Sequence, residues 1–143
     1  MQTTIGIIKP EAIQRGLVEI IIERIRQSGL VVEASSRRRL THEEVDLVYR
    51  NVKEQWLHDS RMAYLTSNDV ILLKVTGENA VKRLLEIRGY SSQRPAAPGT
   101  IRGDFAKDQY YAELKKQKKI ALTVFHACDS EEEAGVLISR LSI

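Results

Sequence analysis

The sequence predicts an α+β fold in which helices pack against a four-stranded antiparallel sheet. Short β-branched or aliphatic runs alternate along the chain with segments whose apolar residues recur at helical spacing. Turn and capping signals separate these segments. Their order is βαββαβ with one further helix, which is typical of a ferredoxin-like sandwich with helices on one face of the sheet plus additional helices.

Four runs have the character of strands. Residues 3–8 are β-branched, and a following proline ends the run because the residue before proline avoids helical geometry. Residues 30–39 have a second half that is polar on both faces, which suits an exposed sheet edge. The apolar run within 69–75 is the best candidate for a central strand, and residues 120–125 form the last strand.

Helical spacing and capping signals predict the helices. Residues 17–28 and 79–87 carry apolar side chains at helical spacing, and a glycine follows each segment as a stop signal. Capping boxes open two more helices, at Thr41 with Glu44, from which the helix continues through Val52, and at Ser130 with Glu133.

Composition limits the kind of protein this is. The 143 residues suffice for one domain, 1–143, and no apolar run approaches the roughly 18 residues that span a bilayer. The N-terminus lacks a secretory pattern, so we expect a cytoplasmic protein without membrane contact. A net charge of +3 mildly favours anionic partners. The histidines at positions 42, 58 and 126 are too far apart for a zinc site, and no metal site is expected.

Three segments that are distant in sequence could supply one active site: 7–10, 98–105 and 126–130. Taken alone, Lys9 could be surface charge and His126 a satisfied core histidine. Together they offer the nucleophilic nitrogen and the cationic donors that phosphate transfer requires. The chain has no G-x-x-x-x-G-K-[ST] loop, which excludes ordinary P-loop phosphate binding.

Residues 7–18 and 98–105 match two signatures of the nucleoside diphosphate kinase family nearly residue for residue, and the chain resembles that family from residue 4 to about 142. The resemblance implies a ferredoxin-like subunit that assembles into hexamers or tetramers built from dimers. It also implies Mg²⁺-bound nucleotides as substrates and a ping-pong transfer between nucleoside tri- and diphosphates. No nucleic-acid partner is expected.

The resemblance implies a role for individual positions as well. His126 is the expected phosphate-accepting nucleophile. The expected nucleotide-binding positions are Lys9, Tyr49, Leu57, Leu85, Ser91, Arg102 and Thr123. For Tyr49, packing in the core remains an equal alternative.

Several positions depart from the family's pattern. Leu85 replaces a phosphate-binding arginine, Thr123 an asparagine and Leu57 the phenylalanine against which the base stacks. The glutamate that orients the histidine corresponds to Leu137. An insertion of about eleven residues within 106–119 looks helical and basic.

These departures leave alternatives open. A nucleotide-binding relative with weak or no kinase activity competes with the active kinase, whereas an RNA-binding ferredoxin-like module lacks the expected aromatic motif. For the insertion, one hypothesis is that Tyr110 or Tyr111 replaces the stacking surface and a lysine approaches the phosphates near Leu85. The alternative is a solvated basic helix. Cys128 is expected to be a packing residue rather than a redox switch.

Overall fold

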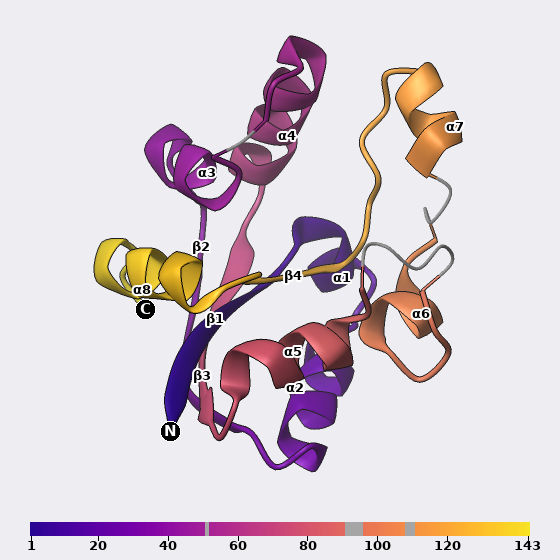
Figure 1. The fold of residues 1–143 in the computed structure, drawn as a ribbon. Helices are drawn as coiled ribbons and strands as arrows, with labels where there is room; N and C mark the ends of the chain where they lie inside the picture. The colour runs from indigo at the N-terminus through magenta and orange to yellow at the C-terminus, as the bar shows by residue number, and fades with distance from the viewer. Residues whose placement is uncertain (51, 91–95, 108–110) are drawn as a thin grey trace.

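The computed structural model describes residues 1–50, 52–90, 96–107 and 111–143. The elements follow one another as β1 (Gln2–Ile8), α1 (Pro10–Gln14), α2 (Val18–Gln27), β2 (Val31–Arg38), α3 (His42–Val48), α4 (Gln55–Ser67), β3 (Val70–Gly77), α5 (Ala80–Arg88), α6 (Ile101–Phe105), α7 (Tyr111–Lys116), β4 (Phe125–Ala127) and α8 (Glu131–Arg140) (Figure 1). No helix in this described part of the chain has both the length and the apolar character needed to cross a bilayer.

The four strands form one antiparallel sheet in the order β2-β3-β1-β4. This confirms the predicted α+β fold with a four-stranded antiparallel sheet. β3 is central and buried on both faces, as expected for an almost uninterrupted aliphatic run. β2 is an edge strand whose residues alternate between exposed and half-buried, which agrees with its polar sequence.

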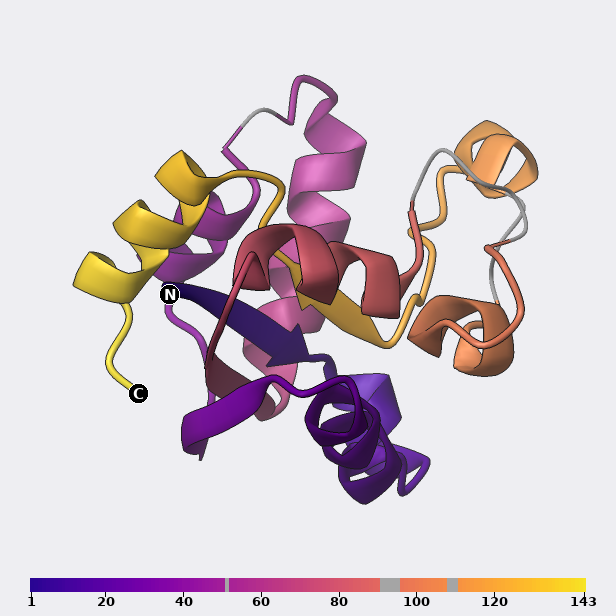
Figure 2. The same ribbon diagram turned by 60° about the horizontal axis from the view of Figure 1, so that its bottom comes forward.

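Helices cover both faces of the sheet (Figures 1 and 2). On one face, Leu73 and Val75 pack with the apolar sides of α2 and α5, the two helices of the ferredoxin-like pattern. On the opposite face, Ile5, Ile7 and Leu72 pack against α3, α4 and α8, which are the additional helices. Neighbouring strand residues point to opposite faces, so the sheet separates two apolar clusters.

Sequence reasoning did not predict α4. Its apolar residues do not keep to one side of the helix, and only Leu65 is buried. Glu54 at its N-cap is not one of the preferred capping residues and makes no side-chain capping bond. The preceding helix, α3, ends at Val48 rather than continuing through Val52, and Tyr49 is its C-cap. The chain therefore turns here into a helical hairpin.

The predicted strand at 120–125 is wrong in its position. Only Phe125–Ala127 is a strand, so His126 lies within β4, opposite Ile7, rather than after it. Val124 has a φ of 63°, which is unusual for a β-branched residue and prevents extended geometry. The Phe125 N–H donates to Thr123 O at 2.7 Å and closes a tight turn just before the histidine.

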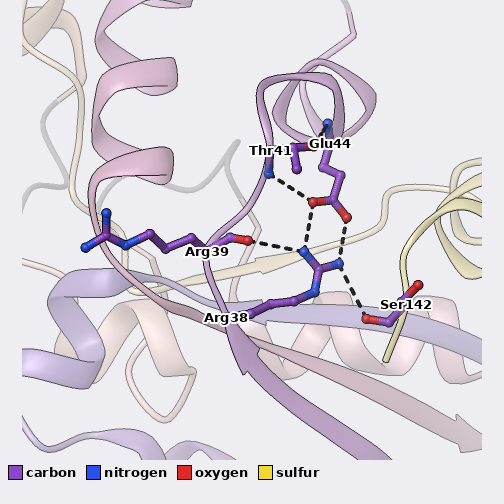
Figure 3. A network of polar contacts seen from close by, with 5 residues as sticks. All are labelled: Arg38, Arg39, Thr41, Glu44 and Ser142. Atoms are coloured by element: carbon purple, nitrogen blue, oxygen red, sulfur yellow. Dashed lines mark hydrogen bonds and ion pairs between the residues drawn. The ribbon is translucent and has the colours of Figure 1, made fainter.

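A network of polar contacts fixes the start of α3 to the end of β2 (Figure 3). Arg38 donates to both carboxylate oxygens of Glu44, at 2.8 and 2.6 Å, and to Ser142 O at 3.4 Å. Glu44 also accepts from the Thr41 N–H and donates its own N–H to Thr41 Oγ1, which confirms the predicted capping box. The hydrogen bonds from Arg38 hold the pKa of Glu44 below its usual value. The network therefore anchors the helix that ends at Tyr49.

Candidate active site

A cavity of about 750 Å³ opens where β1 ends, between the helical hairpin α3–α4, the strand β4 and the segment that follows α7. Basic side chains line it more densely than acidic ones. The basic residues are Lys9, Arg50, Arg61, Arg88, Arg102, Lys115 and Lys119, and the acidic residues are Glu54, Asp129 and Glu133. Such a cavity attracts anions. Six expected site residues meet here: Lys9, Tyr49, Leu57, Arg102, Thr123 and His126.

His126 points into this cavity from β4 with 7% of its surface exposed. The Tyr49 ring meets its imidazole edge to face, with 5.3 Å between the ring centroids. Nε2 lies 3.4 Å from Glu133 Oε1. Burial lowers the pKa of His126, the contact with Glu133 opposes this change, and the positive charge of Lys9 adds to it. The arrangement favours a neutral imidazole.

Glu133 comes from the first turn of α8, one turn before Leu137. Its N–H donates to Ser130 Oγ at 3.1 Å, and its Oε2 accepts from the Asp129 N–H at 2.8 Å. Burial alone would raise the pKa of Glu133, but the contact with His126 and the bond from Asp129 outweigh it and hold the pKa below its usual value. Sequence reasoning identified Glu133 only as a capping residue. Its contact with His126 was not expected, because the family's glutamate corresponds to Leu137, four residues later.

Lys9 is buried next to the histidine. Its Nζ donates to Thr123 Oγ1 at 2.9 Å, and both side chains line the cavity. Burial and the nearby charges of Arg102 and Arg61 lower the pKa of Lys9 well below its usual value. A bound anion would relieve this destabilisation of the ammonium form.

Arg102 reaches the cavity from the first turn of α6 and donates to Phe125 O at 2.9 Å. Thr100 caps this short helix by accepting from the Gly103 N–H at 2.9 Å. A side chain at Gly103 would collide with the carbonyl oxygen of Ala97, so the tight turn requires glycine. The second signature segment therefore acts chiefly by placing Arg102.

Tyr49 lies between the cavity and the apolar core. It lines the cavity, and its ring also packs against the apolar cluster below α3 and α4. The guanidinium of Arg61, from α4, stacks over the Tyr49 ring with 4.4 Å between Cζ and the ring centroid. Burial raises the pKa of Tyr49, so its hydroxyl stays protonated and can donate a hydrogen bond.

The insertion forms one wall of the cavity. α7 confirms the predicted helix, and Leu114 and Lys119 line the cavity together with Leu57 and Trp56. Lys115 pairs with Glu54 at 3.0 Å. Tyr110 lies outside the described residues, as does the side chain of Tyr111, so the stacking hypothesis stays a hypothesis.

Two expected positions remain, of which Leu85 does not line this cavity. Leu85 is buried in the core and borders a second hollow of about 330 Å³, next to Gln2 and Val81. Ser91 lies outside the described residues. One turn after Leu85, the buried side chain of Arg88 lines the first cavity. The signal that could have identified Arg88 is its spacing: it is a basic residue three positions after the position where the family has an arginine, on the same helix.

Two further expectations concern sulfur and metals. Cys128 is fully buried, and burial raises the pKa of its thiol to about 11, which agrees with a packing residue.

Within the described ranges, no group of three or more His, Cys, Asp or Glu residues could hold a metal ion. Asp129, three-quarters exposed at the rim of the cavity, is the kind of single carboxylate that Mg²⁺ uses beside substrate phosphates.

Comparisons with known proteins show which proteins the chain is similar to. The family model described as nucleoside diphosphate kinase matches residues 2–140. A nucleoside diphosphate kinase of Campylobacter hominis is 35% identical over 134 residues, covering 94% of this chain and 90% of the relative. One from Ignicoccus hospitalis is 37% identical over 135 residues, covering 94% and 84%. The fold is similar to that of a Borrelia burgdorferi nucleoside-diphosphate kinase, described as a transition state mimic with bound vanadate and ADP. The TM-score is 0.85 and the sequence identity 23%, and the match covers 96% of this chain and 84% of the other.

Proposed function

The chain belongs to the nucleoside diphosphate kinase family, and we propose that its phosphate transfer proceeds through His126 in the cavity described above. It is a phosphotransferase that moves the terminal phosphate of a nucleoside triphosphate to a nucleoside diphosphate. The observation that carries the proposal is a buried histidine that faces a cationic cavity and has a carboxylate next to its Nε2.

The transfer takes place in two steps of the same kind. With the proton held on Nε2 by Glu133, the lone pair of His126 Nδ1 attacks the terminal phosphorus. A nitrogen–phosphorus bond forms, the bond to the bridging oxygen breaks, and the nucleoside diphosphate leaves with that electron pair. A second nucleoside diphosphate then attacks the phosphohistidine with a terminal oxygen and restores the neutral imidazole.

Lys9 and Arg102 stabilise the negative charge of the phosphate that moves. Both are buried and point into the cavity close to the histidine, where a low dielectric strengthens their interaction with an anion. Phosphate binding raises the pKa of Lys9 toward its usual value, because the anion favours the ammonium form. Tyr49 and Thr123 contribute hydrogen-bonding groups at the same wall.

The base and sugar occupy the outer part of the cavity, between Leu57 on α4 and Leu114 on α7. We further propose that the nucleotide arrives as its Mg²⁺ complex; Asp129 at the cavity rim would help to hold the ion, which would neutralise phosphate charge. The chain 1–143 acts as one domain in a homo-oligomer, a hexamer or tetramer built from dimers, in the cytoplasm. Membership in the family supports these proposals, and the Borrelia protein described with bound ADP supports the binding of a nucleotide.

The proposal is tested with γ-labelled ATP in the absence of acceptor. The wild-type chain should take up label that is lost in acid and retained in alkali, as expected of phosphohistidine, and ADP or GDP should remove it. His126→Asn should take up none. His58→Asn is the matched control, because His58 lies on the outer surface of α4 next to Asp46 and Asp59. Label that persists in His126→Asn, or exchange without any labelled enzyme, would contradict a histidine intermediate at this position.

A further inference from the structure

The arginine missing at position 85 has a neighbour on the same side of α5. Leu85 and Arg88 are three residues apart, so their side chains leave the helix close to the same face. Leu85 packs in the core and borders the second hollow, and it does not line the cavity that contains His126. Arg88 is the last residue of the helix, and its long side chain extends to the cavity that contains His126.

Short contacts hold the Arg88 guanidinium beside β4. Nε donates to Gly89 O at 3.0 Å, and Nη1 lies 3.4 Å from Ala127 O, the carbonyl that follows His126. Nη1 is also 4.0 Å from Asp129 Oδ1 at the cavity rim. Only 5% of the residue is exposed. The guanidinium is therefore a placed, buried cation next to the nucleophile rather than a solvated surface charge.

The charges around it favour a polyanion. The positive charges of Arg102, Arg61 and Arg88 all act on Lys9 and, together with burial, lower its pKa. Like charges at such close range repel one another, and the repulsion is weakly screened in a buried site. A ligand with several negative charges would offset this repulsion, and a nucleoside di- or triphosphate is such a ligand.

We propose that Arg88 binds the phosphate chain of the nucleotide and so supplies, one helical turn later, the cation that position 85 lacks. The inference rests on the proposed function for the identity of the ligand. A guanidinium can donate two parallel N–H bonds to phosphate oxygens. With the cation one turn later, Leu85 packs in the core and Arg88 binds phosphate.

Equilibrium binding of ADP and of adenosine tests the proposal. Trp56 is the only tryptophan of the chain and lines the cavity, so its fluorescence reports occupancy. Arg88→Met should weaken ADP binding by about 10- to 100-fold, the loss of one charged hydrogen-bonding partner, and leave adenosine binding unchanged. Arg83→Met is the matched control on α5, because Arg83 instead donates to Glu78 O and Ser28 O. It should change neither affinity.

Three results would overturn the inference: ADP affinity that survives in a folded Arg88→Met chain, equal losses for ADP and adenosine, or an equal loss of ADP affinity in Arg83→Met. If Arg88→Met does not fold, NMR of the wild-type chain decides. The Nε–H resonance of Arg88 is identified by its disappearance in Arg88→Lys. Its chemical shift should change on addition of ADP and stay the same with adenosine. An unchanged chemical shift with ADP refutes the contact. A wild-type chain that binds ADP but forms no phosphohistidine would contradict the proposed function and leave the Arg88 contact standing.

Discussion

Replacing Glu133 by glutamine removes the negative charge next to the candidate nucleophile while keeping the size of the side chain. In the wild-type chain the two carboxylate oxygens serve different partners, since Oε1 faces His126 Nε2 at 3.4 Å and Oε2 accepts from the Asp129 N–H at 2.8 Å. Glutamine has a single acceptor oxygen and cannot serve both. Its backbone N–H still reaches Ser130 Oγ, so the helix cap should persist.

The size of the effect follows from the geometry of the contact. A hydrogen bond to a charged group contributes about 1.5–3 kcal/mol, or roughly 10- to 150-fold if it acts wholly in the transition state. Nε2 is buried, and at 3.4 Å its contact with Glu133 is too long for a full hydrogen bond in the free enzyme. Catalytic contacts of this kind often tighten only when substrate binds. We therefore expect Glu133→Gln to lower the rate of phosphohistidine formation by about tenfold, near the lower limit of that range.

The pH dependence separates this role from a merely structural one. The neutral form of His126 attacks, so the rate falls as pH drops through its pKa. Burial lowers this pKa and Glu133 opposes the shift. Removing the charge of Glu133 therefore lowers the pKa further, and the acidic limb of the profile should move to lower pH.

Rapid-quench measurement of His126 phosphorylation across a pH series is the assay. Glu132→Gln, a neighbouring exposed carboxylate, should behave as wild type. A Glu133→Gln chain with an unchanged plateau and an unmoved acidic limb would refute the reasoning. So would an equal effect in Glu132→Gln.

Three further predictions concern stability and reactivity. Gly103→Ala should lower the free energy of unfolding in urea by at least about 2 kcal/mol, because the new Cβ collides with a backbone carbonyl. Gly135→Ala, on α8 with open space around it, should raise that free energy by about 0.5–1 kcal/mol; the reverse order would contradict the tight turn at Gly103. Glu44→Gln breaks the bidentate pair with Arg38 and should cost about 1.5–3 kcal/mol near neutral pH. Since the pKa of Glu44 is lowered in the folded chain, this difference should disappear as pH falls through that pKa, and a pH-independent difference would argue against the ion pair. The Cys128 thiol should resist a disulfide reagent near neutral pH until the chain unfolds, because it is buried and its pKa is raised to about 11; rapid reaction of the folded chain would restore the redox-switch alternative.

The central part of the fold could be predicted because its residues leave little choice. The aliphatic run of β3 is buried on both faces, and polar β2 lies at the edge, as each pattern requires. α4 was missed because helical hairpins of this kind depend on tertiary contacts around a single buried leucine, Leu65, rather than on a continuous apolar stripe. The position of β4 was missed because the backbone at Val124 adopts a conformation that its sequence disfavours.

The candidate site could be predicted where each role stays at its own position. Lys9 follows β1, Arg102 follows a tight turn and His126 lies within β4, and the sequence match was enough to expect all three at the cavity that they line. Arg88 and Glu133 lie one helical turn away from the positions where their roles were sought. A long side chain can reach the same point in space from either turn, and only the folded chain shows which one it uses.

The short β4 strand has a consequence for motion. Its three residues pair with β1 alone at the edge of the described sheet, and strained Val124 precedes them. A strand with only one neighbouring strand needs less free energy to open locally than a central strand. Detachment also relieves the backbone strain of the turn at Val124. Amide protons here should exchange with solvent well before those of β3. Loosening of this edge would uncouple His126 from Glu133 while the core stays folded, so inactivation on heating should precede global unfolding.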